Sequence, residues 1–187
     1  MKMKVLVTCP PMLKQIQEFR HLFISRNIDL ITPNVIQTLS EEELIAIVPE
    51  VDGWIIGDDP ATRKVFEAGR SGNLKAAVKW GVGIDNVDFK ACKDLNIPIS
   101  NTPKMFGDEV ADLAIAYFLA LARQTHYIDR EVRLGNWIKP AGISLKGKTV
   151  AVVGLGDIGQ ATVRRLKGFE VLINAYDPFT EHSANDL

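Results

Sequence analysis

The sequence has little cysteine and little histidine, and it carries almost no net charge. Only two cysteines and three histidines occur among 187 residues, and 22 basic residues nearly balance 23 acidic ones, which leaves a formal charge of −1. Cys9 and Cys92 form no spacing pattern, so we expect two thiols in a cytoplasmic protein, no disulfide and no metal site. The balanced charge gives no bulk attraction to nucleic acid or to an anionic membrane.

Long hydrophobic runs are also missing. The most apolar predicted helix contains Asp112 and is free of charge only from Leu113 to Ala122, far short of the ~20 residues that a membrane span needs. The first residues, MKMKVLVTCPP, have too short an apolar run for a secretory signal. The remaining composition, 47% hydrophobic and 24% charged, is that of an ordinary globular protein with room for one domain and part of another.

Short apolar runs alternate with helical patterns over residues 1–100. The expected strands are 4–8, 28–31, 54–56, 74–80 and 97–100. An amphipathic helix is expected over 13–23, and Ser40 with Glu43 predicts a capping box at the start of another. Asp59 followed by Pro60 predicts the N-cap of a helix that extends to about Gly69. The alternation predicts a parallel, doubly wound α/β sheet.

A glycine-containing turn, GVGIDNVD, follows the expected strand at 74–80. Ligands of open α/β sheets bind beyond the carboxyl ends of the strands. Gly81 and Gly83 would leave backbone N–H groups bare and form an anion nest suited to a carboxylate. The alternative, which this segment favours by itself, is a plain turn with Asp88 as the N-cap of a helix that ends near Leu95. Asn101 is likewise a turn residue by default.

Residues 149–178 read TVAVVGLGDIGQATVRRLKGFEVLINAYDP. The run 150–153 predicts a buried parallel strand, and a helix and a second strand at 171–176 follow it. Gly154, Gly156 and Gly159 between strand and helix have the spacing G-x-G-x-x-G. Gly154 permits a tight turn out of the strand, and Gly156 permits the backbone to approach a pyrophosphate. Gly159 permits the helix to pack closely on the strand.

Two further features of this segment complete a dinucleotide fingerprint. The amino end of the helix offers unpaired N–H groups and a positive dipole to phosphates. Asp177 ends the second strand, where its carboxylate can accept hydrogen bonds from the adenosine ribose and repel a 2′-phosphate. The segment therefore predicts NAD rather than NADP. A complete dinucleotide-binding sheet has six strands, and only the first two are expected here.

Residues 107–124 form the most apolar predicted helix. Its apolar side chains surround nearly the whole circumference, so it has to be covered on several sides. We expect it between domains or at a subunit interface, with a core position in one domain as the alternative. A second helix is expected over 125–137, and 140–147 is the expected linker to the dinucleotide segment.

Three segments carry a family resemblance: KWGVGIDNVD (79–88), SNTPKMFGDEVADLAIAYFLALAR (100–123) and LKGKTVAVVGLGDIGQ (145–160). Together they resemble the D-isomer-specific 2-hydroxyacid dehydrogenases, and among these the phosphoglycerate dehydrogenase-like branch. The resemblance implies an α/β chain with a flavodoxin-like substrate domain (1–100), interdomain and dimerisation helices with a linker (101–140), and the first part of a Rossmann NAD-binding domain (141–187). The implied activity is NAD-dependent oxidation of the CH–OH group of a D-2-hydroxy acid.

The resemblance also assigns roles to individual positions. The backbone at Val82 and Gly83 would hold the substrate carboxylate, and Asn101 would line the same cleft. The implied cofactor-binding positions are Val110 beside the nicotinamide, Gly154, Gly156, Asp157, Ile158 and Gly159 at the pyrophosphate, and Asp177 at the adenosine ribose. The helix at 107–124 would join two copies as a homodimer.

The catalytic arginine, glutamate and histidine of the family lie downstream of the second Rossmann strand, so we expect no catalytic residue in this chain. His21, His126 and His182 do not match the motif of the family's histidine. The resemblance therefore implies an inactive isolated chain with poor NAD affinity. Exposed apolar strand edges favour low solubility or dimerisation. The alternatives are a non-catalytic NAD-sensing or dimerising module, or a gene fragment.

One loop argues against a phosphorylated substrate. Asp58 and Asp59 follow the expected strand at 54–56, in a position that is basic in phosphate-recognising members of the family. We therefore do not expect 3-phosphoglycerate itself to be the substrate.

Overall fold

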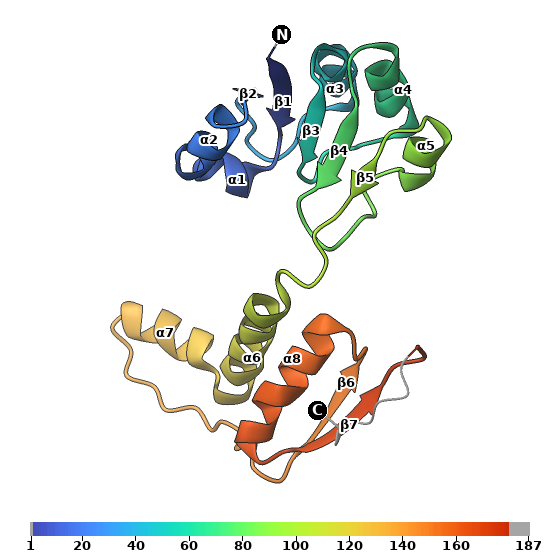
Figure 1. Cartoon of the computed structure of the whole chain (residues 1–187). Coiled ribbons are helices and arrows are strands. Elements are labelled where there is room, and N and C mark those ends of the chain that lie inside the picture. Colours follow the sequence, from blue (N-terminus) through green and yellow to red (C-terminus); the bar gives the residue numbers. More distant parts are fainter. Residues whose placement is uncertain (1, 180–187) are drawn as a thin grey trace. The chain divides into compact units, whose positions relative to one another are not determined.

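The computed structural model describes residues 2–179 and divides the chain into two compact units, Met1–Met105 and Phe106–Leu187 (Figure 1). The strands of the first unit are β1 (Met3–Val7), β2 (Ile28–Ile31), β3 (Gly53–Ile56), β4 (Ala76–Lys79) and β5 (Ile99–Ser100). Its helices are α1 (Pro10–Lys14), α2 (Ile16–Ile24), α3 (Glu41–Ile47), the 3-10 helix η1 (Val48–Glu50), α4 (Arg63–Ser71) and α5 (Phe89–Asp94).

All five strands of the first unit are parallel, in the order β2-β1-β3-β4-β5. This is the flavodoxin-like strand order, so the predicted doubly wound sheet is confirmed. Leu6 on β1 lies between Ile31 on β2 and Trp54 on β3. Because every strand runs in the same direction, the loops after β1, β3, β4 and β5 leave the sheet at one edge.

The core of the first unit lies on both faces of this sheet. Leu6, Trp54 and Ile56 belong to the larger cluster, with Phe66 of α4, and the rings of Trp54 and Phe66 lie 5.9 Å apart. Val7 packs on the other side with residues of α1 and α2. The two clusters follow from the period-2 alternation of strand side chains.

Both cysteines are buried free thiols, as expected. Burial raises the pKa of the Cys92 thiol to about 12 and also raises the pKa of Cys9. Both side chains therefore act as small apolar core residues.

Two caps follow the sequence prediction. The Ser40 hydroxyl accepts a hydrogen bond from the Glu43 amide, and the Glu43 carboxylate accepts one from the Ser40 amide. Asp88 caps α5 by accepting a hydrogen bond of 2.7 Å from the amide of Ala91. The helix expected over 13–23 is two helices, because the backbone of Gln15 leaves the helical conformation. Its amide donates a hydrogen bond to the Met12 carbonyl, which ends α1.

The expected N-cap at Asp59 is wrong. Helix α4 begins at Arg63, and the Asp59 side chain is fully buried instead of facing solvent. Its carboxylate accepts hydrogen bonds from the amides of Leu39 (2.9 Å) and Gly57 (3.0 Å) and from the hydroxyl of Thr8. The aspartate is thus committed to distant partners, which the local Asp-Pro pattern does not reveal.

The second unit contains α6 (Gly107–Arg123), α7 (Thr125–Arg133), β6 (Thr149–Val153), α8 (Asp157–Leu166), the 3-10 helix η2 (Lys167–Phe169) and β7 (Leu172–Tyr176). The two strands are parallel, and α8 connects them. Helix α8 packs against α6, and Arg165 joins the helices through Asp108 (3.0 Å) and Asp112 (2.5 Å). The predicted strand–helix–strand segment is confirmed.

The sheet of the second unit is covered on one face only. Val153, Leu172 and Tyr176 are 83%, 64% and 65% exposed, whereas alternate residues such as Val152 are partly covered. The expectation of a buried strand at 150–153 is therefore wrong for one face of β6. Within residues 2–179, β6 and β7 pair only with each other.

An apolar stripe runs along α6. It consists of Val110, Leu113, Tyr117 and Leu121, which are 40%, 50%, 62% and 71% exposed. Their spacing places them on one helix face, and Asp108 and Asp112, which pair with α8, fall on the opposite face. This stripe is the uncovered part of the apolar circumference noted in the sequence.

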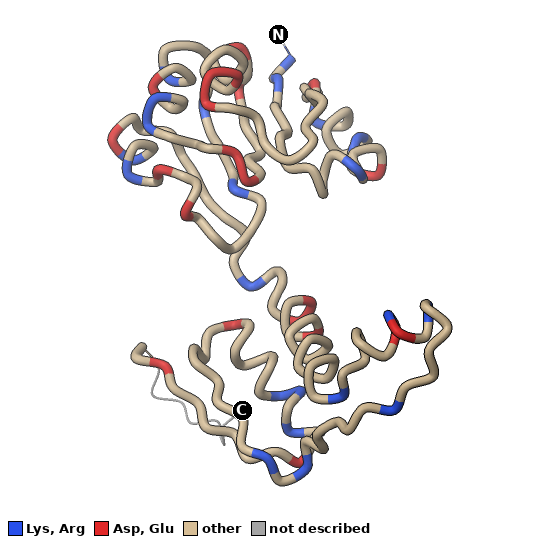
Figure 2. The backbone as a smooth tube through the Cα atoms, turned by 180° about the vertical axis from the view of Figure 1, so that it is seen from behind, with Lys and Arg blue, Asp and Glu red and all other residues tan. Residues whose placement is uncertain are grey.

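Charged residues of both signs are interspersed along the tube of the chain (Figure 2). Every ion pair among the described residues has at least one exposed partner, and in most of them the other partner is exposed or half-buried, so such pairs contribute little to stability. The exception is Lys79, whose side chain is only 4% exposed. None of the helices in the described part of the chain is both long and apolar enough to cross a membrane.

Candidate functional site

The turn after β4 is held by residues that follow β5. The Gly81 amide donates a hydrogen bond to the Thr102 hydroxyl (2.9 Å), and the Thr102 amide donates one to the Gly81 carbonyl (3.0 Å). The Asn101 side-chain amide donates to the Val82 carbonyl (2.9 Å). The structure thus brings Asn101 beside Val82, the neighbour of Gly83.

The predicted anion nest needs one correction. The Gly81 N–H is not bare, because the Thr102 hydroxyl accepts its hydrogen bond. Within residues 2–179, the amides of Val82 and Gly83 donate no hydrogen bond, and both residues are exposed. Gly81 has a φ of +136°, which glycine adopts without strain. The amides of Val82 and Gly83 therefore remain available, and they are the two that the family resemblance assigns to a substrate carboxylate.

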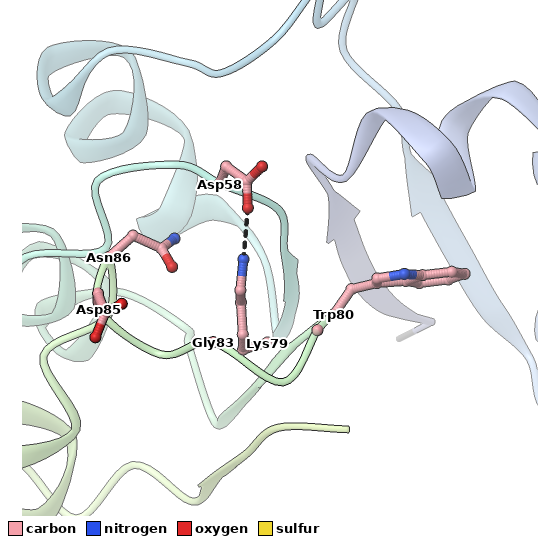
Figure 3. A pocket seen from close by; sticks show the side chains of 7 residues that line it. Asp58, Lys79, Trp80, Gly83, Asp85 and Asn86 are labelled. Atoms are coloured by element: carbon pink, nitrogen blue, oxygen red, sulfur yellow. Dashed lines mark hydrogen bonds and ion pairs between the residues drawn. The ribbon is translucent and has the colours of Figure 1, made fainter. Parts of the chain in front are cut away.

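A pocket of about 370 Å³ opens beside this turn (Figure 3). It is lined by Asp58, Lys79, Trp80, Gly81, Gly83, Asp85 and Asn86. Lys79 is the last residue of β4, and its Nζ donates hydrogen bonds to the Gly57 carbonyl (2.6 Å) and to Asp58 Oδ1 (2.8 Å). Trp80 points away from this pair (Figure 3).

Sequence reasoning missed Lys79. A lysine at the end of a short strand is ordinarily a solvent-facing residue, yet this one is 3% exposed. The only signal was its position two residues before Gly81. Asn86 supports the same loop, since its side-chain amide donates to the carbonyls of Gly57 (3.1 Å) and Asp59 (2.7 Å).

The glycine turn of the second unit has the geometry of a phosphate-binding turn. Gly154 has a φ of +95°, and its amide donates a hydrogen bond of 2.7 Å to the Tyr176 carbonyl. A Cβ on Gly159 would overlap the Gly154 carbonyl oxygen, whereas one on Gly156 would meet no atom within 4 Å. Gly156 caps α8, so the first amides of that helix are open to an anion.

Asp177 lies beside this turn. Its Oδ2 accepts a hydrogen bond of 2.6 Å from the Leu155 amide, and its Oδ1 accepts one of 2.8 Å from the Phe179 amide. The carboxylate is therefore fixed at the carboxyl end of β7, next to the loop that the glycines form. This is the location that a ribose-binding acid requires in a dinucleotide fold.

The other positions that the family resemblance assigns to the cofactor lie at the amino ends of two helices. Asp157 and Ile158 are in the first turn of α8 and are exposed. A Cβ on Gly107, the first residue of α6, would collide with the Asp157 carboxylate, so the two helix ends touch. Val110 lies one turn further along α6, and its side chain is 40% exposed. Asp157 adds a negative charge to a turn that is otherwise suited to phosphate.

Two of the three histidines fall within the described residues, and neither belongs to a glycine turn. His21 is exposed on α2, and His126 Nδ1 lies 3.2 Å from the Ala120 carbonyl oxygen at the start of α7. His182 is outside the described residues. The described residues also contain no group of three His, Cys, Asp or Glu side chains that could hold a metal ion.

A family model for the catalytic domain of D-isomer specific 2-hydroxyacid dehydrogenases matches residues 5–185. The chain therefore belongs to the D-isomer specific 2-hydroxyacid dehydrogenase family. The match covers both turns, and it confirms the resemblance read from the three motifs.

Two curated relatives are each 38% identical to this chain. A hydroxypyruvate reductase of Thermotoga maritima matches over 143 residues, which are 75% of this chain and 46% of the relative. A D-3-phosphoglycerate dehydrogenase of Archaeoglobus fulgidus matches over 144 residues, 75% of this chain and 27% of the relative. The chain thus corresponds to less than half the length of either protein.

Solved structures with this fold include D-lactate dehydrogenase of Escherichia coli, at a TM-score of 0.79 and 25% identity, over 100% of this chain and 58% of that one. The NAD+-bound 3-phosphoglycerate dehydrogenase of Entamoeba histolytica has a TM-score of 0.80 at 24% identity, over 98% and 57% of the two chains. At 24% identity, the likeness to the Entamoeba histolytica enzyme shows a shared fold.

Proposed function

We propose that this chain supplies the carboxylate-binding turn and the pyrophosphate-binding turn of an NAD-dependent oxidoreductase that acts on the CH–OH group of a D-2-hydroxy acid. The supporting observation is that both turns stand at the carboxyl ends of parallel strands, with backbone amides available, in a chain of this family. Of the named relatives, the hydroxypyruvate reductase is named for reducing a 2-oxo acid and the D-3-phosphoglycerate dehydrogenase for oxidising a 2-hydroxy acid.

Each turn has a defined task in this proposal. The amides of Val82 and Gly83 bind the substrate carboxylate, and Asn101 fixes the turn through the Val82 carbonyl. The first turn of α8, with Asp157 and Ile158, binds the pyrophosphate through backbone N–H groups. When bound, NAD supplies the acceptor for the hydride that leaves the substrate carbon. The open space at Gly156 fits such a ligand.

We propose further that the proton-transfer residues are not among these 187. Removing a general acid or base costs ~10²–10⁴ in rate, so the purified chain is expected to show no NADH oxidation with glyoxylate or hydroxypyruvate. The chain would then act as a binding module. Steady NADH oxidation by the pure chain would contradict this part of the proposal.

The first prediction concerns the choice of cofactor. Asp177→Asn keeps an oxygen that can accept the Leu155 hydrogen bond, but it removes the charge that repels a 2′-phosphate. A hydrogen bond to a charged group contributes about 1.5–3 kcal/mol, so the preference for NAD over NADP should fall by roughly tenfold or more. Calorimetric titration of both dinucleotides measures it.

The matched control is Asp129→Asn, an exposed aspartate of α7 that pairs with Arg133. It should leave the preference unchanged. If wild type binds NADP as tightly as NAD, the proposed role of Asp177 is wrong. If neither dinucleotide shifts the amide signals of residues 154–159, the pyrophosphate site is wrong.

The second prediction concerns assembly. We propose that Leu113, Tyr117 and Leu121 of the α6 stripe join two copies of the chain as a homodimer, because exposed apolar side chains in a row are a surface that monomers seldom leave in water. Leu121→Lys should raise the dissociation constant of the dimer at least tenfold. The mass measured by light scattering should therefore shift toward that of the monomer. Ala116→Lys, on the same helix outside the stripe, should not. A wild-type monomer at high protein concentration would refute the dimer.

A further inference from the structure

We propose that Asp58 and Lys79 make the pocket after β3 and β4 selective for acids with a single negative charge, and that they exclude acids carrying a second anionic group such as a phosphate. The inference rests on the proposed function, which places the substrate carboxylate at Val82 and Gly83. It assigns a specificity role to Asp58, an exposed residue, through the buried Lys79.

The ammonium group of Lys79 is already engaged. Its side chain is 4% exposed, and Nζ donates to the Gly57 carbonyl at 2.6 Å and to Asp58 Oδ1 at 2.8 Å. A buried ammonium needs such partners. Among the described residues that line the pocket, the lysine is the only cation, and Asp58 neutralises it before any ligand arrives. Figure 3 shows Lys79 extended toward Asp58.

The carboxylates outnumber the cation in the lining. Asp58 and Asp85 contribute two negative charges and Lys79 one positive charge, which leaves one net negative charge. The Asp58 side chain is 84% exposed, so it stands at the mouth of the pocket. A ligand carboxylate can bind the amides of the turn, but a second anionic group would meet a neutralised lysine and two carboxylates.

A neutral hydroxyl group suits this lining. Lysine has three N–H donors, and two of those on Lys79 are used by the partners named above. The third N–H can donate to a hydroxyl oxygen, while the hydroxyl hydrogen is donated to Asp58. The ligand class is therefore a 2-hydroxy or 2-oxo monocarboxylate whose remaining substituent is uncharged, with a hydroxymethyl group as a good fit.

The test compares D-glycerate with 3-phospho-D-glycerate, which differ only in the phosphate. Nuclear magnetic resonance titrations of the full chain follow the amides of Val82 and Gly83. Wild type should bind D-glycerate at least tenfold more tightly. Asp58→Asn keeps an oxygen that can accept the Lys79 hydrogen bond but leaves the ammonium charge without its counter-charge. The variant should reduce that preference by roughly tenfold, because charges about 4 Å apart interact strongly near a protein surface.

Two control variants separate the causes. Asp85→Asn removes the same charge but leaves the Lys79 ammonium paired with the Asp58 carboxylate, so it should change the preference less. Asp129→Asn, in the other unit, should not change it. A preference in Asp58→Asn that stays within twofold of wild type, or wild type binding the phosphate ester as tightly, overturns the inference alone. If D-glycerate leaves the Val82 and Gly83 amides unshifted in wild type, the proposed carboxylate site fails and the inference fails with it.

Discussion

Asp59→Ala should lower the free energy of unfolding of the first unit by about 3 kcal/mol or more. The buried carboxylate accepts hydrogen bonds from Leu39, Gly57 and Thr8, and each hydrogen bond to a charged group contributes about 1.5–3 kcal/mol. Alanine leaves the Leu39 amide without a partner among the described residues, and it leaves only longer hydrogen bonds to the other two donors, from the Thr8 hydroxyl to the Ile55 carbonyl (3.3 Å) and from the Gly57 amide to the Thr8 hydroxyl (3.4 Å). The loss is therefore a desolvation cost in addition to a lost attraction.

The network extends further into the core. The Trp54 indole N–H donates to the Thr8 hydroxyl at 3.0 Å, and Trp54 is 1% exposed. Urea denaturation followed by tryptophan fluorescence therefore reports on this region directly. The loop before Ser40 depends on the same carboxylate through the Leu39 amide, so it should become accessible to protease in the variant.

Asp29→Ala is the control for Asp59→Ala. Asp29 is an exposed aspartate on β2 that pairs with Lys2 at 3.3 Å, and exposed pairs contribute about 0–1 kcal/mol. Its removal should hardly shift the denaturation midpoint. An Asp59→Ala variant within about 1 kcal/mol of wild type would show that water replaces the carboxylate, contrary to the buried network.

Gly159→Ala should disable the glycine turn of the second unit. The new Cβ would overlap the Gly154 carbonyl oxygen, so either α8 or the turn has to move. Overpacking of this kind typically costs about 1–3 kcal/mol, and it outweighs the gain of up to about 1 kcal/mol that alanine brings to a helix. NAD binding should weaken by at least tenfold, because the amides of the turn lose their alignment.

Gly168→Ala provides the matched control, since a Cβ at Gly168 meets no atom within 4 Å. Both variants add one methyl group to the same βαβ segment. Calorimetric titration with NAD, together with the urea midpoint of each variant, separates loss of binding from loss of folding. Gly159→Ala with wild-type NAD affinity would mean that the turn does not position the cofactor.

Much of the fold could be predicted from local patterns. The strand, glycines, helix and strand of 149–178 form β6, α8 and β7, because backbone conformation at Gly154 and packing at Gly159 are set by neighbours in sequence. Ser40 and Asp88 cap their helices for the same reason. These features need no information from distant parts of the chain.

Other features depend on distant partners and could not be predicted. Asp59 has the pattern of an N-cap, but Leu39 and Thr8 engage it across the unit. The hydroxyl of Thr102, which lies in a different loop, accepts a hydrogen bond from the Gly81 amide. Lys79 is buried because the loop after β3 provides a carbonyl and a carboxylate for it. In each case a polar side chain has a partner more than 18 residues away in the sequence.

The uncovered face of β6 and β7 has a practical consequence for anyone who handles this chain. Val153, Leu172 and Tyr176 present aliphatic and aromatic groups to water on one side of a two-stranded sheet. Such surfaces on different copies of the chain associate more as the protein concentration rises. Storage in dilute solution, or fusion to a highly charged carrier, will preserve the folded chain better than added sulfate, which strengthens apolar association.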